Sequence, residues 1–187
     1  MILGICGRKR SGKDTVADYI TEHYNFTRYG FADPIKRAVC EAFGWDQDEM
    51  EKPENKERVD PTWGISYRQA LQDMGTDWAQ LGLSKRYPEF KRVTGRTMWV
   101  KRFLQEVENY PEKNWVVSDI RFHHEMYELS KTPNFYSIKV TRPENNNIID
   151  MHYSERDIDK LQTNCKIIND GTLDDLYDKV NQIMWKL

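Results

Sequence analysis

The segment GRKRSGKDT, residues 7–15, constrains the fold of this chain more than any other stretch. Two glycines separated by four residues, with a lysine after the second, form the pattern of a loop whose backbone N–H groups cradle phosphate oxygens. The apolar run from Ile2 to Cys6 precedes the loop and predicts a buried parallel strand. From Lys13 onward, apolar residues recur at helical spacing. A phosphate loop between a strand and a helix therefore predicts an α/β domain built on a parallel sheet.

The rest of the chain repeats this order of strand and helix. Strands are predicted in FTRYG, WVVSD, FYSIKVT and CKIIND, and helices in TMWVKRFLQEVENY and in the last residues, where Thr172 is the expected N-cap. We expect Asp33 to cap a helix that begins at Pro34, and Gly75 to end the helix in RQALQDM. Residues 46–62 are polar and contain two prolines, which predicts a surface loop or a flap.

Charge and cysteine content exclude several classes of protein. The 187 residues carry a formal net charge of −2, so binding to nucleic acid through bulk charge is not expected. The three cysteines are far apart and lack metal-ligand spacing, which favours a reducing compartment. No apolar run approaches the length of a membrane span, and MILGICG is too short for a signal peptide. We expect a cytoplasmic protein with no nucleic-acid or membrane partner.

The chemistry of the loop predicts a site for ATP. Gly12 lets the backbone approach a phosphate closely, and Lys13 places a charge on the β- and γ-phosphates. The helix that follows directs its positive N-terminal end at the same anion. The residues that we predict to bind ATP are Gly7, Arg10, Ser11, Gly12, Lys13, Asp14 and Thr15.

Asp14 occupies the position where the motif usually has a serine or threonine for magnesium. Two interpretations stay open: Asp14 holds Mg²⁺ or touches the acceptor, or it only complements the positive end of the helix. Thr15 is a second candidate for a phosphate or for the metal. Lys9 and Arg10 add charge that suits a second phosphorylated substrate, although a solvated basic turn would look the same.

Two strand ends supply further candidates. Asp119 closes the apolar strand WVVSD at the sheet edge where α/β proteins bind ligands, and is the second predicted Mg²⁺ residue. Arg121 can reach a transferring phosphoryl group, unless it only pairs with Asp119. Arg142 ends another strand and is a candidate for the phosphates. The turn of residues 169–171 lies either near the adenine or only at the start of the last helix.

Taken together, these segments resemble the deoxynucleoside monophosphate kinases of tailed phages. The resemblance is carried by GRKRSGKDT, DPIKRA, RQALQDMGTD, WVKRF, VVSDIRFHHEM, VTRP, HYSE and INDGTLDDLY, which occur in the family's order along nearly the whole chain. It implies a P-loop kinase fold in a single domain, residues 1–187, with a helical acceptor-binding and lid insertion at about residues 46–112. It also implies transfer of the γ-phosphoryl group of ATP to a deoxynucleoside 5′-monophosphate, with Mg²⁺ as the metal.

The resemblance assigns roles to individual residues. In the family the second and third cations of the loop lie near the phosphates, which here are Lys9 and Arg10. Our hypothesis for the catalytic residues is that Lys13 binds the donor phosphates, that Arg10, Arg121 and Arg142 neutralise charge on the transferring group, and that Asp119 holds Mg²⁺. The acceptor would lie near Lys9, Arg68, Gln72, Gly75, Thr76 and Trp78, and Arg58, in the segment that matches the family least, is a further candidate. A guanidinium suits a phosphate dianion, and an indole either stacks on a base or packs in the core or at an interface. The segment HYSE, with His152, Ser154 and Glu155, is expected near a lid, where Arg96 or Arg102 would be the lid arginine. A homodimer is compatible with this fold. For a phage protein, the location would be the host cytoplasm.

Two other functions remain as alternatives. Another small-molecule P-loop kinase, acting on dephospho-coenzyme A or phosphomevalonate, uses a similar loop. A non-catalytic nucleotide-binding module would bind ATP without transferring phosphate. The pair RQALQDMGTD and SDIRFHHE favours deoxynucleotides, and a panel of acceptors would separate these functions.

Overall fold

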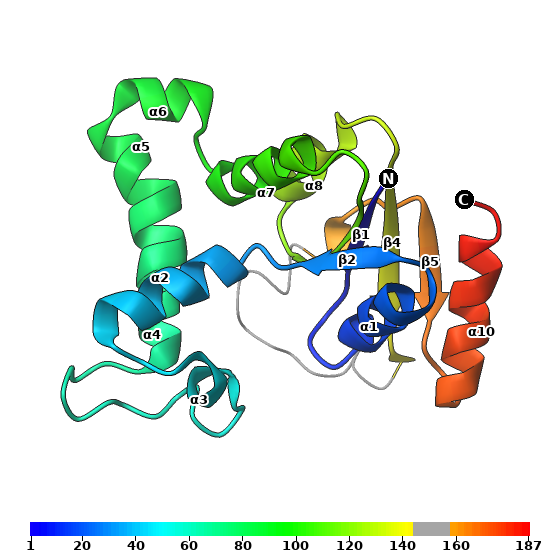
Figure 1. Cartoon of the computed structure of the whole chain (residues 1–187), viewed down its shortest axis with the longest axis horizontal. Helices are drawn as coiled ribbons and strands as arrows, with labels where there is room; N and C mark the ends of the chain where they lie inside the picture. The colour runs from blue at the N-terminus through cyan, green and yellow to red at the C-terminus, as the bar shows by residue number, and fades with distance from the viewer. Residues whose placement is uncertain (144–157) are drawn as a thin grey trace. The chain divides into compact units, whose positions relative to one another are not determined.

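The computed structural model describes residues 1–143 and 158–187 (Figure 1). The chain forms two compact units, one of residues 1–30 and 103–187 and one of residues 31–102. We call them the sheet unit and the helical unit. The insertion expected at about residues 46–112 overlaps the helical unit for most of its length. No helix in the described ranges is both long and apolar enough to cross a membrane.

The sheet unit is built on five parallel strands. β1 lies at the centre of the order β2-β3-β1-β4-β5, and every neighbouring pair is parallel. This arrangement confirms the α/β fold with a parallel sheet. The bounds of the strands are β1 Ile2–Cys6, β2 Phe26–Tyr29, β3 Asn114–Ile120, β4 Phe135–Thr141 and β5 Cys165–Ile168.

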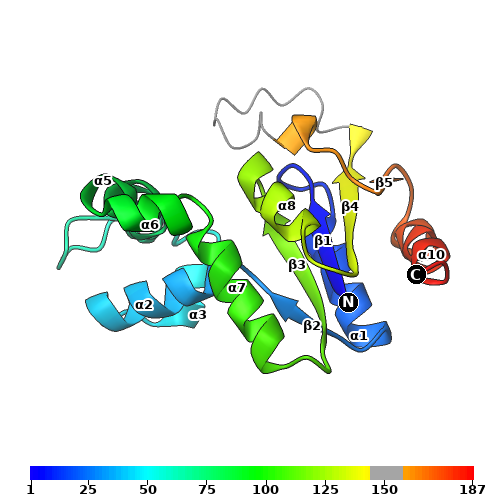
Figure 2. The ribbon, with the colours of Figure 1, turned by 90° about the horizontal axis from the view of Figure 1, so that it is seen from above.

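Helices cover both faces of this sheet, as Figure 2 shows: α1 and α10 lie on one face and α8 lies on the other. Their bounds are α1 Lys13–His23, α8 His123–Ser130 and α10 Leu173–Met184. The core on the first face joins Leu3 and Ile5 of β1 to Val16 and Ile20 of α1 and to Val180 of α10. These side chains are fully buried, which confirms the amphipathic helices predicted at both ends of the chain.

β3 contains a bulge beside the predicted site. Gly4 of β1 pairs with Val117, whereas Cys6 pairs with Ile120, so β3 has one more residue than β1 at Ser118 and Asp119. A bulge interrupts the strict alternation of side chains and re-aims them. Ser118 lies toward α1, where it contacts Asp14. The end of β3 is therefore irregular at Asp119, the second predicted Mg²⁺ residue.

The helical unit consists of short helices. They are α2 Asp33–Phe43, α3 Gln47–Glu51, α4 Tyr67–Gln72, the π-helix η1 Asp73–Gly82, α5 Leu83–Arg86, α6 Pro88–Val93 and the first residues of α7 Met98–Asn109. A cluster of aromatic rings, Phe43, Trp45, Trp63 and Tyr67, joins α2 to α4 and to the segment between α3 and α4. The indole of Trp45 donates to Asp60 at 2.9 Å, which fixes that connecting segment to α2.

The predicted end of a helix at Gly75 is wrong. Gly75 lies inside η1, which continues α4 directly into α5. A side chain at Gly75 would lie 2.9 Å from Cδ1 of Ile35, so the glycine permits close packing of η1 on α2. Its carbonyl accepts a hydrogen bond from the indole of Trp99 at 2.8 Å. The glycine therefore serves a contact between helices rather than a left-handed turn.

Two other local predictions need correction. Asp33 is the first residue of α2 and not its cap; the N-cap is Ala32, and Pro34 follows within the first turn. Residues 46–62 are not wholly a loop, because α3 forms inside them. Asp46 caps α3 by accepting a hydrogen bond from the N–H of Glu49 at 2.9 Å. An aspartate three residues before a glutamate is a helix-start pattern, and it outweighs the polarity of the segment.

Candidate active site

The phosphate loop has the backbone of an anion-binding nest. Gly12 is the N-cap of α1, with φ of +97°, and Arg10 has φ of +64°. In the described residues, the other non-glycine positions with positive φ are Asn25 and Asn134. Asparagine adopts this conformation much more readily than arginine, so Arg10 marks local strain. Alternating left-handed and helical residues turn successive N–H groups toward one concave point.

Packing behind the loop requires both of its glycines. A Cβ on Gly7 would lie 2.4 Å from the carbonyl oxygen of Val140 in β4. A Cβ on Gly12 would lie 2.5 Å from Nδ2 of Asn169. That same amide donates to the carbonyl oxygen of Ser11 at 3.0 Å, and Asn169 is buried. The end of β5 therefore fixes the loop through Asn169, a role in addition to the turn expected at residues 169–171.

Lys13 is held by its neighbour. Its ammonium donates to Oδ2 of Asp14 at 2.9 Å, and Arg28 of β2 donates to Oδ1 of Asp14 at 2.7 Å. Burial opposes ionisation of Asp14, but the hydrogen bond and charge of Lys13, together with Arg28, hold the pKa of Asp14 below its usual value. Asp14 is thus an anion between two cations at the first turn of α1.

A cavity of about 370 Å³ opens at this end of the sheet unit. It brings together Arg10 and Arg142, two of the predicted phosphate residues, which come from distant parts of the chain. Leu173 and Leu176 of α10 add an apolar wall. The residues that line the cavity are Arg10, Gly12, Asp14, Thr15, Arg142, Asn169, Gly171, Thr172, Leu173 and Leu176. The mixture of cations, loop backbone and leucines suits a phosphate chain with an attached base.

The segment after β3 is held by a buried carboxylate. Oε2 of Glu125 accepts the backbone N–H groups of Arg121 at 2.8 Å and of Phe122 at 3.0 Å. Burial raises the pKa of Glu125 to about 7, and Asp119 adds to the rise, while the two backbone hydrogen bonds oppose it. Glu125 thereby fixes the backbone that carries Asp119 and Arg121, and the Arg121 side chain is exposed.

The residues at this site fit a magnesium ion that is held mainly by a ligand's phosphates. Among residues 1–143 and 158–187, no cluster of three or more His, Cys, Asp or Glu side chains could bind a metal ion by itself. Mg²⁺ at nucleotide sites commonly uses one or two carboxylates with phosphate oxygens and water. Asp14 and Asp119 would offer carboxylates and Thr15 a hydroxyl, and of these three residues Asp14 and Thr15 line the cavity. Ser118, whose Oγ lies 3.5 Å from Oδ1 of Asp14, adds a neighbouring hydroxyl.

The predicted acceptor residues lie in the helical unit, apart from Lys9 of the loop. Arg68 forms an ion pair with Glu57, and Arg58 is exposed. Gln72 is exposed, whereas Thr76 is half-buried and Gly75 is buried. Trp78 is 51% exposed, so this indole does not pack in the core, and packing at an interface stays open as the alternative to stacking on a base. The π-helix that carries Gly75, Thr76 and Trp78 is a rare form that is frequently found at functional sites.

Several other predicted features, where the structure describes them, do not line the cavity at the loop. His152, Ser154 and Glu155 lie outside the described residues. Lys9 is exposed on the loop. Arg8, the remaining loop cation, pairs with Asp159. Of the two lid candidates, Arg96 contacts Gln80 within the helical unit, with Nε 3.5 Å from Oε1.

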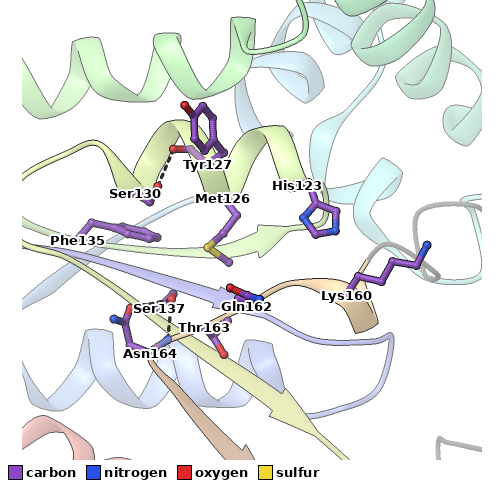
Figure 3. A pocket seen from close by; sticks show the side chains of 10 residues that line it. All are labelled: His123, Met126, Tyr127, Ser130, Phe135, Ser137, Lys160, Gln162, Thr163 and Asn164. Carbon is purple, nitrogen blue, oxygen red and sulfur yellow. Dashed lines mark hydrogen bonds between the residues drawn. The ribbon is translucent and has the colours of Figure 1, made fainter.

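A larger cavity, about 660 Å³, lies on the α8 face of the sheet between α8, β4 and residues 160–164 (Figure 3). Of the predicted site residues that the structure describes, none lines it. Two of its polar side chains satisfy each other, because Ser137 donates to Oδ1 of Asn164 at 2.9 Å. The predicted phosphate-binding residues Arg10, Gly12 and Arg142 line the smaller cavity at the loop instead.

Sequence reasoning missed three residues that support the site: Arg28, Asn169 as a loop anchor, and Glu125. Glu125 stands three residues after Phe122, the spacing of a capping box, but phenylalanine does not signal a cap. Arg28 and Asn169 act across elements that lie far apart in the chain, and no local pattern marks them. Only the fold brings them to the loop.

Comparisons with known proteins identify the family. The family model described as deoxynucleotide monophosphate kinase matches residues 1–70 and 59–180. The deoxynucleotide monophosphate kinase of Escherichia phage RB69 is 25% identical, over 98% of this chain and 99% of the relative. A protein of Acanthamoeba polyphaga mimivirus that provisionally carries the same name is 28% identical, over 96% of this chain and 94% of its own.

Solved structures show the same fold at low identity. TT1252 from Thermus thermophilus has a TM-score of 0.50 at 20% identity, and covers 100% of this chain and 97% of its own. Dephospho-CoA kinase from Campylobacter jejuni has a TM-score of 0.51 at 12% identity, with 99% and 96% covered. These likenesses support the P-loop kinase fold expected from the sequence. With the family model matching most of its length, the chain belongs to the deoxynucleotide monophosphate kinase family.

Proposed function

We propose that this protein transfers the γ-phosphoryl group of ATP to a deoxynucleoside 5′-monophosphate and releases ADP and the deoxynucleoside diphosphate. Membership of a kinase family makes the chain a phosphotransferase with ATP as co-substrate. The observation that carries the proposal is the loop itself. Its left-handed residues Arg10 and Gly12, at the start of α1, form a nest for phosphate beside Lys13.

The donor is bound by the sheet unit in this proposal. The first N–H groups of α1 have no intrahelical partners, so they are available to the β- and γ-phosphates, whereas the N–H of Ser11 in the loop donates to the carbonyl oxygen of Arg8 at 3.1 Å. Lys13 exchanges Asp14 for the phosphates when ATP arrives. Leu173 and Leu176 offer the adenine an apolar wall in the same cavity.

Charge on the transferring group is neutralised by arginines. Arg10 and Arg142 line the donor cavity, and Arg121 follows the end of β3. Each guanidinium can bind two oxygens of the phosphoryl group at once. Mg²⁺, when held by Asp14, Thr15 and Asp119 with the phosphates, supplies further neutralisation of charge. These groups stabilise the transition state electrostatically, which is the main requirement of phosphoryl transfer.

The acceptor is bound by side chains of the helical unit in this proposal. Arg68 exchanges Glu57 for the 5′-phosphate, with Arg58 as a second cation. Gln72 reads a base edge, with Gly75 and Thr76 beside it in the chain, while the exposed indole of Trp78 stacks on the base. An oxygen of the acceptor phosphate attacks the γ-phosphorus, and the bond from that phosphorus to the β–γ bridging oxygen breaks. The acceptor phosphate is already an anion, so the step requires no strong general base.

The experiment that tests this function is a panel of acceptors. ATP and Mg²⁺ are supplied with each deoxynucleoside monophosphate in turn, with dephospho-coenzyme A, and with phosphomevalonate, while ADP release is followed. We expect ADP release to depend on at least one deoxynucleoside monophosphate. Release that depends only on one of the other two acceptors would assign the chain to another kinase activity. ATP binding with no turnover on any acceptor would indicate a nucleotide-binding module.

A further inference from the structure

Arg28 joins three elements at the base of the phosphate loop. It lies on β2, an edge strand of the sheet. One nitrogen of its guanidinium donates to Oδ1 of Asp14 at 2.7 Å and to Oγ of Ser118 at 3.0 Å. The other terminal nitrogen pairs with Asp18, one turn further along α1. A single side chain therefore connects β2 to the first turns of α1 and to the bulge of β3.

Asp14 is the group through which Arg28 reaches the loop. Its two oxygens are divided between two cations, since Oδ1 contacts Arg28 and Oδ2 contacts Lys13. A phosphate chain in the loop would require Lys13 to leave Asp14. It would also lie close to the carboxylate of Asp14, which would repel it. Arg28 lies on the opposite oxygen and does not have to move.

We propose that Arg28 is a positioning residue of the donor site, which holds and neutralises Asp14 so that Lys13 can turn from Asp14 to the phosphates of ATP. This inference rests on the proposed role of the loop as the ATP site. Arg28 acts through Asp14 and touches neither substrate. Its guanidinium keeps a fixed charge and a planar fork, which suits a residue that must hold an anion while a neighbouring cation departs.

The contact with Asp18 separates this role from a general structural one. Exposed ion pairs usually contribute little, and Asp18 pairs with Arg28 without facing Lys13. If Arg28 only held β2 against α1, substitution of Asp18 would change ATP binding about as much as substitution of Asp14. If Arg28 acts on Lys13 through Asp14, the loss of ATP binding in an Arg28 variant must depend on the carboxylate of Asp14 and not on that of Asp18.

The experiment is a double-mutant cycle read by ATP binding in EDTA, by calorimetry, with thermal unfolding of each variant measured in parallel. The variants are Arg28→Met, Asp14→Asn, the double variant, and Asp18→Asn as the matched control. We expect Arg28→Met to weaken ATP binding about tenfold in the wild-type background and less than about threefold in the Asp14→Asn background. Asp18→Asn should bind ATP within about twofold of wild type.

Three results would overturn the inference: unchanged ATP binding by Arg28→Met, an equal loss with and without the Asp14 carboxylate, or the same loss in Asp18→Asn. If Arg28→Met does not fold, Arg28→Lys takes its place in the same cycle, because it keeps the charge but cannot bridge the same partners. ADP release by the wild-type protein is measured separately with the deoxynucleoside monophosphates. Failure there would refute the proposed function, whereas the cycle reports on Arg28 and the loop.

Discussion

The sheet unit and the helical unit carry their candidate residues in different ways. In the sheet unit, the proposed donor site is built mainly from backbone: a loop with left-handed residues, glycines with no room for a side chain, and a buried asparagine that fixes the loop. In the helical unit, the candidates are mostly side chains at the surface, such as Trp78, Gln72 and the Arg68–Glu57 pair. The difference teaches that donor binding is sensitive to backbone geometry, whereas acceptor choice can vary by exchanging side chains.

The largest effect is expected at the cation of the donor site. Lys13→Ala should lower the turnover of ATP with a deoxynucleoside monophosphate by about 10²–10³-fold, because the variant loses a charge on the transferring group. Lys131→Ala is a matched control, since Lys131 pairs with Glu128 on the surface of α8. Steady-state ADP release measures both variants. Turnover within about tenfold of wild type in Lys13→Ala would break the assignment of the donor site.

A glycine pair tests the claim that the donor site depends on backbone. Gly12→Ala introduces a Cβ 2.5 Å from Asn169 at a φ of +97°, whereas Gly44 has a φ of +67° with nothing within 4 Å of its Cβ position. We expect Gly12→Ala to weaken ATP binding at least about tenfold, and Gly44→Ala to cost only about 1 kcal/mol of stability with unchanged binding. Calorimetry and thermal unfolding measure the two quantities. Equal ATP binding by the two variants would contradict the claim.

A tryptophan pair tests the helical unit. Trp78 and Trp63 are both about half exposed, but Trp63 also donates to the carbonyl of Phe43 at 3.1 Å and packs on that ring. Trp78→Ala should raise the KM for the deoxynucleoside monophosphate about tenfold, through lost stacking, with little change in the KM for ATP. Trp63→Ala should lower thermal stability and leave both KM values near wild type. A rise in the KM for ATP in Trp78→Ala would contradict the division between the units.

The last effect, on stability rather than on turnover or binding, concerns Glu125, whose pKa in the folded protein is about 7 against an ordinary value of 4.5. The native state binds a proton between these values that the unfolded state has released. The free energy of unfolding should therefore fall as pH rises from about 4.5 to about 7, by at most about 1.4 kcal/mol per pH unit, and then level off. Glu125→Gln should remove this slope in denaturant unfolding at several pH values. The same slope in the variant would assign it to another group.

How far the sequence predicts this molecule depends on the range of the interaction. The parallel sheet, α1 and the capped α10 follow from local patterns: an apolar strand, helical periodicity and Thr172 before an apolar helix. The π-helix at Gly75 and the bulge at Ser118 do not follow from local patterns. Gly75 is selected by its contacts with Ile35 and Trp99, which lie far away in the chain.

How well the sequence predicts the candidate site also depends on the range of the interaction. Local motif spacing identifies Gly7, Gly12 and Lys13, because the loop that they form is a short contiguous segment. The roles of Arg28, Glu125 and Asn169 depend on contacts between strands, helices and the loop, and no sequence motif predicts these contacts. The acceptor residues are inferred from resemblance alone, because exposed side chains leave no periodic signal.

The central claim is that the loop at residues 7–15 delivers the γ-phosphoryl group of ATP to a deoxynucleoside monophosphate. The most direct test supplies ATP labelled in its γ-phosphate, Mg²⁺ and each deoxynucleoside monophosphate, and follows where the label goes. We expect label in the β-phosphate of a deoxynucleoside diphosphate with the wild-type protein and almost none with Lys13→Ala. Label that remains in ATP or appears only as inorganic phosphate, with every acceptor, would contradict it.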